Sequence, residues 1–322
     1  MECRYSEEVC PSLYETHGLA NGIPLRRHKN AVKEHRGALK AQSDWAQHVH
    51  PLNGYKGGLG DPFSFMQVTL PECCPERLEI ISYANEYAFL YDDEMEKLNL
   101  KNESETMAWT LETFTEDMSN DGIDLKTRAE NRLFINALRM MMAIDAERAT
   151  TTIKAWSTYM RLAAGTRHSS FETLETYVPA RIIDAGELLW FGLLTFGMAL
   201  TIPDEEYNLC MELARPAYAA LGLTNDLFSW TKEQKAAEQA DHDYVFNAVW
   251  VIMKERLVSE SQAKVICGEE IKKYISEFCG RVERARSKER LSKDVWVYLE
   301  ALRYSYSGNL VWSIYCPRYQ DG

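Results

Sequence analysis

Residues 76–98 read ERLEIISYANEYAFLYDDEMEKL, a stretch that joins a long apolar pattern to a cluster of acidic residues. Its apolar residues recur at spacings of three and four, which is the period of an amphipathic α-helix. The buried face that this period defines consists of Ile80, Ala84, Tyr87, Ala88 and Tyr91. The stretch therefore predicts a helix whose acidic end points towards the interior of a helical bundle.

The same period continues along most of the chain and decides the fold class. Further helices are predicted over about 31–50, 131–163, 171–200, 204–238, 243–286 and 292–313. Pro216 lies inside one of these segments and is expected to kink or split it. The chain shows no strand-like alternation, internal repeat or inter-domain linker. We predict an all-α, single-domain bundle of about ten helices.

Composition and charge restrict the possible partners. The chain of 322 residues has a net charge of −12, which argues against a nucleic-acid partner because phosphate binding needs a basic face. Acidity does not exclude a phosphorylated substrate if metal ions lie between it and the carboxylates. The N-terminus lacks the apolar core of a signal peptide, and the longest apolar run, 188–200, is too short to span a membrane. We expect a cytoplasmic protein with reduced cysteines and no transmembrane segment.

Residues 51–75 are rich in glycine and proline and are predicted to form a long loop. The segment GYKGGLG (54–60) invites comparison with a phosphate-cradling loop. Its glycine spacing matches neither of the common phosphate-binding motifs, and no predicted strand precedes it. We therefore do not expect a phosphate site there.

The segment 225–233, NDLFSWTKE, places oxygen donors along one face of a predicted helix. Asn225, Ser229 and Glu233 are four residues apart, so their side chains share one stripe. Oxygen atoms are the ligands that Mg²⁺ prefers. Lys232 adds a cation suited to an anionic substrate, and the apolar neighbours argue against a solvated surface stripe. This segment predicts a metal site.

The acidic cluster 92–96 predicts a second group of metal ligands. Asp92 and Glu96 lie four residues apart on one helix face, where like charges repel. The C-terminal end of a helix also disfavours negative charge, so a bound cation would compensate both penalties. An isolated DDxxE is more often a solvated helix end, but this one follows a long buried face.

Together the two motifs resemble those of class I terpene synthases. Their second metal motif, (N/D)DxxSxxxE, is met in full by 225–233, and 92–96 looks like their aspartate-rich motif with glutamate in place of the last aspartate. More narrowly, the chain resembles the cyclase half of fungal bifunctional di- and sesterterpene synthases of the fusicoccadiene and ophiobolin F type. The stretches that carry this resemblance, which covers essentially the whole chain, are IPLRRH (23–28), PECCPERLEIISYANE (71–86), GLTNDLFSWTKE (222–233) and YSGNLVWSIYCPRY (306–319).

The resemblance implies the class I terpenoid synthase fold, a helical bundle with a central active-site cavity, over residues 1–322. It implies a magnesium-dependent cyclase that ionises geranylgeranyl or geranylfarnesyl diphosphate, or both, and converts the allylic carbocation into a polycyclic diterpene or sesterterpene hydrocarbon. Full-length relatives carry a C-terminal prenyltransferase domain. The chain stops at Gly322, where the linker to that domain would begin, so we expect that domain to be absent.

The resemblance also assigns residue roles. Arg181 matches the arginine that senses diphosphate, and Asp184 matches the residue that links it to the effector turn. Ala185 and Gly186 follow where relatives often have glycine first, so the effector position stays open. The expected diphosphate-binding residues are Arg181, Lys232, Arg303 and Tyr304, the last two as the family's arginine–tyrosine pair. The expected ligands of three Mg²⁺ ions are Asp92, Glu96, Asn225, Ser229 and Glu233, with Asp93 and Asp226 as supporting partners.

A cyclase pocket also needs aromatic faces, which stabilise a carbocation without offering a nucleophile. The candidates are Phe65, Phe89, Trp156, Trp190, Phe191 and Trp312. Phe89 is favoured because it lies one turn before the acidic cluster. Core packing is the better explanation for at least half of such aromatic residues. We therefore assign a catalytic role to four of the six, Phe65, Phe89, Trp190 and Trp312.

Two alternatives remain open. A chain-elongating prenyltransferase would carry two aspartate-rich motifs, whereas the second motif here is of the asparagine–serine–glutamate kind. A catalytically inactive helical scaffold would be expected to have broken metal motifs, and both motifs are intact. Magnesium-dependent stabilisation by inorganic diphosphate would separate a cyclase from such a scaffold.

Overall fold

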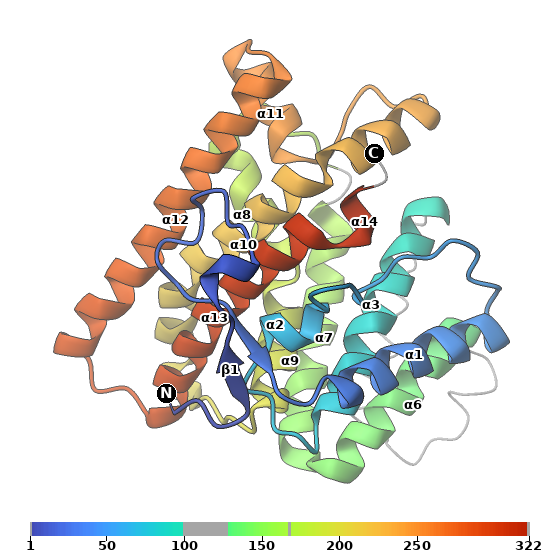
Figure 1. Cartoon of the computed structure of the whole chain (residues 1–322), viewed down its shortest axis with the longest axis vertical. Coiled ribbons are helices and arrows are strands. Elements are labelled where there is room, and N and C mark those ends of the chain that lie inside the picture. Colours follow the sequence, from blue (N-terminus) through green and yellow to red (C-terminus); the bar gives the residue numbers. More distant parts are fainter. Residues whose placement is uncertain (1, 99–127, 167–168, 321–322) are drawn as a thin grey trace.

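The computed structural model describes residues 2–98, 128–166 and 169–320, and α-helices dominate these residues (Figure 1). Two short strands, β1 (Ser6–Glu8) and β2 (Arg26–His28), pair antiparallel near the N-terminus. The predicted all-α class is confirmed. The helices are η1 (Pro11–Leu13), α1 (Ala31–His48), α2 (Phe65–Thr69), α3 (Leu78–Leu98), α6 (Ala129–Ile144), α7 (Ala146–Thr166), α8 (Leu174–Asp184), α9 (Glu187–Gly197), α10 (Asp204–Gln239), α11 (Ala248–Arg256), α12 (Glu260–Lys288), α13 (Lys293–Tyr315) and α14 (Pro317–Gln320).

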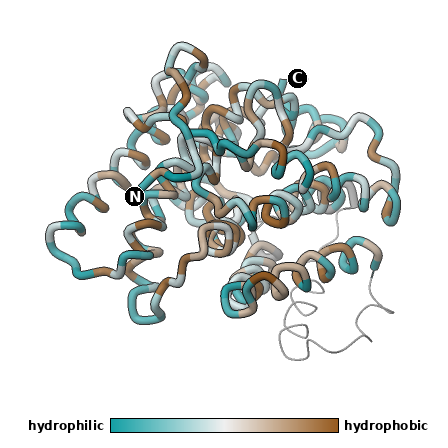
Figure 2. Tube along the Cα trace, turned by 60° about the horizontal axis from the view of Figure 1, so that its bottom comes forward, coloured by the Kyte–Doolittle hydropathy of each residue, from teal (hydrophilic) through white to brown (hydrophobic). Residues whose placement is uncertain are grey.

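Helix α10 contacts both α12 and α13, and α12 lies at the outer side of the bundle in Figure 1. Helix α1 packs along α3, and these two helices together with α6 form the opposite side in that view. Hydrophilic and hydrophobic residues alternate along the helices in Figure 2, as expected for amphipathic helices around a shared core. Large side chains buried in this core include Trp45, Trp156, Tyr177 and Phe278.

The short helix α2 packs unusually close to α13. A Cβ atom at Gly308 would lie 2.1 Å from the carbonyl oxygen of Val68, so a residue without a side chain is needed where the two backbones meet. Phe65 opens α2, and Trp312 lies one turn after Gly308 on α13. Their ring centroids are 4.8 Å apart. This contact therefore brings two of the predicted catalytic aromatic residues together.

Three of the predicted helical stretches are each divided into two helices. The divisions fall at Asp145, at Ala185–Gly186 and at residues 257–259. At the third, Leu257 has a left-handed backbone (φ 54°), and Ser259 starts α12 with a capping box to Gln262.

The expected split at Pro216 does not occur, because α10 continues through it as one helix. Proline has no amide hydrogen, so the carbonyl of Glu212 loses its partner within the helix. The Nη1 atom of Arg281, on α12, lies 3.5 Å from that carbonyl oxygen and donates to it. A neighbouring helix thus satisfies the group that proline leaves open.

The cysteines and the membrane prediction are both addressed by the structure. All eight cysteines are free thiols in the structure. Within the described ranges, no helix combines the length and the hydropathy that crossing a membrane requires.

Candidate active site

A cavity of about 530 Å³ lies among helices that include α3, α8, α9, α10 and α13, and its wall is mainly apolar. The aromatic residues that line it include Phe65, Tyr87, Phe89, Trp190, Tyr218 and Trp312. The ring of Phe65 lies 5.3 Å from that of Phe89 and 5.8 Å from that of Trp190. The structure therefore places the four retained aromatic candidates in one wall.

The other two aromatic candidates lie in the core. Trp156 is 1% exposed and donates from its indole nitrogen to the carbonyl of Leu189 at 2.9 Å. Phe191 packs against the rings of Tyr207 and Tyr298. Neither is among the residues that line the cavity, so core packing accounts for both.

Both acidic motifs reach this cavity. Asp92 lines it from α3, and Asn225 and Glu233 line it from α10. Between the latter two, Ser229 is 2% exposed, and its hydroxyl has no hydrogen-bond partner among the described residues. The side chain of Glu96 lies outside the described part of the structure. Folding thus brings two motifs that are far apart in the sequence to one site.

Arg181 on α8 connects the second motif to the helix break that follows α8. Its Nη2 atom donates to Asn225 Oδ1 at 2.7 Å, and its Nη1 atom donates to Asp184 at 2.5 Å. Burial would lower the pKa of Arg181, but the neighbouring carboxylates of Asp226 and Asp184 raise it well above its ordinary value. The guanidinium therefore stays charged at the cavity wall.

The predicted effector turn also faces the cavity. Asp184, Ala185 and Gly186 all line it, at the point where α8 ends. Gly186 has a positive φ of 87°, a backbone conformation that glycine adopts readily, and α9 starts at the next residue.

Asp226 is fully buried and faces α8 rather than the cavity. Its carboxylate accepts from Arg181 Nε at 2.8 Å and from the Tyr177 hydroxyl at 2.7 Å, and the amide of Ala248 donates to it at 3.0 Å. Burial raises the pKa of Asp226 to about 6, and the Arg181 guanidinium opposes this shift. These contacts suit a supporting role for Asp226 rather than direct metal binding.

Two residues of the C-terminal helix α14 belong to this site, and the sequence analysis did not assign them. Both Nη atoms of Arg318 donate to the carboxylate of Asp93, Nη1 at 3.0 Å, and Lys232 Nζ lies 3.7 Å from the same carboxylate. The hydroxyl of Tyr319 accepts from Asn225 Nδ2 at 2.6 Å. Burial alone would lower the pKa of Arg318, but the bond to the Asp93 carboxylate outweighs burial and raises the pKa above its ordinary value. Helix α14 therefore contacts both acidic motifs.

The structure does not bring Arg303 and Tyr304 to the cavity, which corrects the expectation for the arginine–tyrosine pair. Arg303 instead lies 3.4 Å from the carboxylate of Glu300, and the Tyr304 ring lies beneath the guanidinium of Arg26. The dipeptide occurs twice near the C-terminus, and sequence alone did not separate the two. Only the second, Arg318–Tyr319, contacts the motifs.

The side chains at this end of the cavity fit a hard divalent cation. Asp92 and Glu233 offer carboxylates, Asn225 an amide oxygen, and Ser229 a hydroxyl that the described protein groups leave unbonded. Three cations, Arg181, Lys232 and Arg318, lie beside these donors and could bind an anion that shares the metal.

A family model described as "Terpene synthase family 2, C-terminal metal binding" matches residues 83–277, a range that contains both acidic motifs. The chain belongs to the terpene synthase family.

Curated relatives of this family match nearly the whole chain. It is 45% identical to a bifunctional type I diterpene synthase from Aspergillus flavipes over 323 residues, which cover 99% of this chain and 42% of that protein. It is 44% identical to fusicoccadiene synthase from Phomopsis amygdali, covering 99% of this chain and 45% of the relative. For ophiobolin F synthase from Cochliobolus heterostrophus the identity is 38%, with 98% and 43% covered. The chain therefore spans less than half the length of these relatives.

Solved terpene synthases share the fold. Aristolochene synthase from Penicillium roqueforti superposes with a TM-score of 0.68 at 19% identity, over 90% of this chain and 96% of the other. Wild-type cucumene synthase superposes with a TM-score of 0.66 at 13% identity, over 91% and 98%. The predicted terpenoid synthase bundle is thus confirmed as the fold.

Proposed function

We propose that this chain is a magnesium-dependent class I terpene cyclase. It would ionise geranylgeranyl diphosphate, geranylfarnesyl diphosphate or both, and convert the allylic carbocation into a polycyclic hydrocarbon while releasing diphosphate. One observation carries the proposal: a single cavity combines an aromatic, apolar wall with oxygen donors and buried cations at one end.

In this proposal, Mg²⁺ is held by Asp92, Glu96, Asn225, Ser229 and Glu233, with three ions expected when diphosphate is bound. Bound Mg²⁺ would supply Lewis-acid stabilisation of the negative charge that develops on the leaving group. Asp93 and Asp226 support this set through their bonds to Arg318 and Arg181.

The protein's own cations would bind the diphosphate. Arg181 and Lys232 line the cavity, and Arg318 lies beside Lys232 because both contact Asp93. A guanidinium presents a planar fork of donors that suits phosphate oxygens. We assign the pairing role of an arginine and a tyrosine to Arg318 and Tyr319, in place of Arg303 and Tyr304. Charge on the departing diphosphate is then stabilised by groups already in position.

The aromatic wall would bind the hydrocarbon chain and the cations derived from it. Phe65, Phe89, Trp190 and Trp312 present rings to the cavity, and a cation over such a ring is stabilised by its quadrupole. A mainly apolar wall also keeps water away from the carbocation, which would otherwise be captured as an alcohol.

The substrate length follows from the relatives. Their names describe diterpene and sesterterpene synthases, several of them bifunctional. We propose that residues 1–322 form the cyclase domain, that the natural substrate has 20 or 25 carbons, and that the full-length protein also carries a prenyltransferase domain. A cytoplasmic location remains a prediction from the N-terminal sequence.

The direct test is product analysis. Purified protein and Mg²⁺ are incubated separately with farnesyl, geranylgeranyl and geranylfarnesyl diphosphate, and hexane extracts are analysed by gas chromatography–mass spectrometry. We expect cyclic hydrocarbons from at least one of the two longer substrates, and their loss with EDTA. A longer diphosphate formed only when isopentenyl diphosphate is added would instead indicate chain elongation and contradict the proposal.

A further inference from the structure

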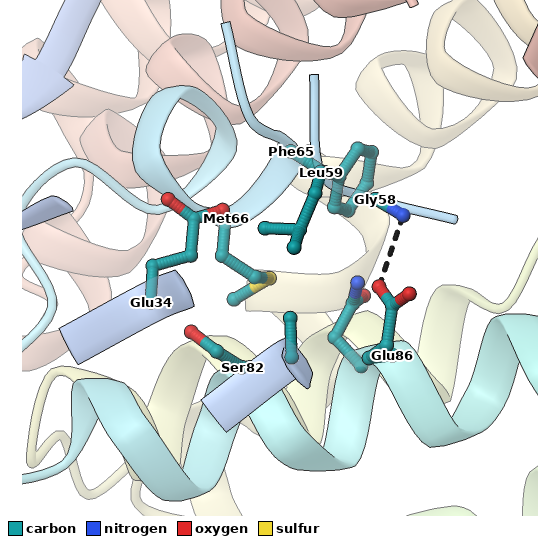
Figure 3. Close-up of a pocket in the computed structure, with 9 residues that line it drawn as sticks. Glu34, Gly58, Leu59, Phe65, Met66, Ser82 and Glu86 are labelled. Carbon is teal, nitrogen blue, oxygen red and sulfur yellow. Dashed lines mark hydrogen bonds between the residues drawn. The ribbon is translucent and has the colours of Figure 1, made fainter. Parts of the chain in front are cut away.

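Glu86 on α3 is a buried carboxylate that the proposed chemistry does not use. It is 1% exposed, and each of its oxygens accepts a hydrogen bond. The amide of Gly58 donates to Oε2 at 2.9 Å, the bond drawn in Figure 3, and Gln42 Nε2 donates to Oε1 at 2.7 Å. The Glu86 side chain therefore links the glycine-rich segment 54–60 to α3.

The two glycines of this segment are needed for that contact. A Cβ atom at Gly57 would lie 1.9 Å from Glu86 Oε1, and a Cβ atom at Gly58 would lie 3.0 Å from Oε2. The glycine-rich sequence thus lets the backbone approach a carboxylate of the protein. A carboxylate in this place would repel a phosphate group, in line with the expectation that this segment does not bind phosphate.

Gly58 also contacts the aromatic wall of the cavity through its carbonyl group. The carbonyl of Gly58 accepts from the indole nitrogen of Trp312 at 3.0 Å and from the amide of Phe65 at 2.8 Å. A Cβ atom at Gly58 would lie 3.2 Å from the Phe89 ring. Gly58 therefore contacts three of the four aromatic residues assigned to the cavity wall.

We infer that Glu86 is a positioning residue that fixes Trp312, Phe65 and Phe89 through Gly58, and thereby sets the ratio of cyclic products. The inference rests on the proposed cyclase function and adds a determinant of its specificity. Glu86 does not touch the cavity, so it acts only through the residues that do.

This tie is separate from the diphosphate end of the site. Asp93 lies seven residues after Glu86 on α3 and pairs with Arg318, which also donates to the carbonyl of Lys56 at 3.1 Å. The segment 54–60 is thus connected to α3 at two points, and only the second involves residues assigned to diphosphate. A change at Glu86 is therefore expected to alter the hydrocarbon wall while leaving diphosphate binding intact.

The test compares variants that differ in whether they can reach Gly58. Glu86→Asp keeps the charge, but its side chain is one methylene too short to reach Gly58. Glu86→Gln keeps an oxygen that can accept from the Gly58 amide. Gln42 can rotate its own amide so that its oxygen accepts from the new amide nitrogen. Gln42→Ala removes the second partner and leaves the Gly58 bond. We expect Glu86→Asp to change the ratio of major to minor hydrocarbons by about twofold or more, with KM within about twofold of wild type. Glu86→Gln and Gln42→Ala should keep the wild-type ratio.

Each outcome decides the matter. A wild-type ratio from Glu86→Asp, or the same shift from Glu86→Gln, would overturn the inference. If Glu86→Asp does not fold, Glu86→Ala removes the same contact together with the buried charge, and an unchanged ratio there would overturn the inference too. Absence of hydrocarbon from the wild-type protein would be a failure of the proposed function rather than of this residue's role.

Discussion

At the residue scale, Arg318 and its neighbour Tyr319 connect the two acidic motifs. Arg318 pairs with Asp93 on α3, while the Tyr319 hydroxyl accepts a hydrogen bond from Asn225 on α10. The asparagine, serine and glutamate of the second motif could be predicted from their spacing, since a helix places them in one stripe. Arg318 could not, because the arginine–tyrosine dipeptide occurs twice near the C-terminus and only the folded chain shows which of these two copies meets the motifs.

Replacing Arg318 tests this correction. We expect Arg318→Ala to lower kcat/KM by about 100-fold, because a charged donor to the leaving group is lost. The matched control, Arg303→Ala, should stay within about threefold of wild type. Steady-state kinetics on the preferred diphosphate give both values, and melting temperatures check that each variant is folded. A large loss in the Arg303 variant together with an active Arg318 variant would restore the original assignment.

Glu34 is a second informative residue, away from the chemistry. It is 2% exposed on α1, its Oε2 atom has no hydrogen-bond partner among the described residues, and it lines a small void beside Met66 and Ser82 (Figure 3). Burial raises the pKa of Glu34 to about 8. Between about pH 4.5 and pH 8 the folded state holds a proton that the unfolded state has released. The contribution of Glu34 to stability therefore falls as pH rises through this window.

Glu34→Gln should remove that dependence. The amide stays neutral, so the variant should gain stability over wild type as pH rises, by up to about 1.4 kcal/mol per pH unit within the window. Urea unfolding at pH 5, 6, 7 and 8 measures the difference. A stability difference that stays constant across these pH values would show that Glu34 is not held protonated.

At the element scale, the helices could be predicted from their apolar period, but several of their ends could not. The break at 257–259 depends on a left-handed Leu257, which no residue type signals. The start of α12 does have a local signal, since the capping box from Ser259 to Gln262 has the Ser-x-x-Gln pattern. The carbonyl that Pro216 leaves without a partner in α10 accepts from Arg281 of another helix, a tertiary contact that a local pattern does not reveal.

The close contact of α2 with α13 gives a prediction at this scale. Gly308→Ala would place a methyl group 2.1 Å from the Val68 carbonyl and force the two backbones apart. We expect a loss of about 3 kcal/mol or more in the free energy of unfolding. Gly268→Ala in α12 is the matched control, because its methyl group would meet only Leu19 Cδ2, at 3.7 Å. It should be neutral or stabilise by about 0.5–1 kcal/mol, since alanine favours helix. Comparable unfolding midpoints for the two variants would refute the close-contact explanation.

At the scale of the whole molecule, an acidic protein brings three of its cations together at the proposed diphosphate site. The net charge is −12, yet Arg181, Lys232 and Arg318 converge from α8, α10 and α14 on the carboxylates of the two motifs. The fold class and the candidate metal ligands could be predicted because they depend on period and spacing. The arrangement of the cations could not, since it depends on which distant segments meet.

The central claim is that these convergent groups form a magnesium–diphosphate site, and the most direct measurement is the melting temperature with each ligand alone and with both. We predict little change with inorganic diphosphate alone and a rise of about 4 °C or more with Mg²⁺ and diphosphate together at saturating concentrations. The rise should be largely lost in Asn225→Ala. No shift with both ligands, or an equal shift in Asn225→Ala, would contradict the assignment of this site.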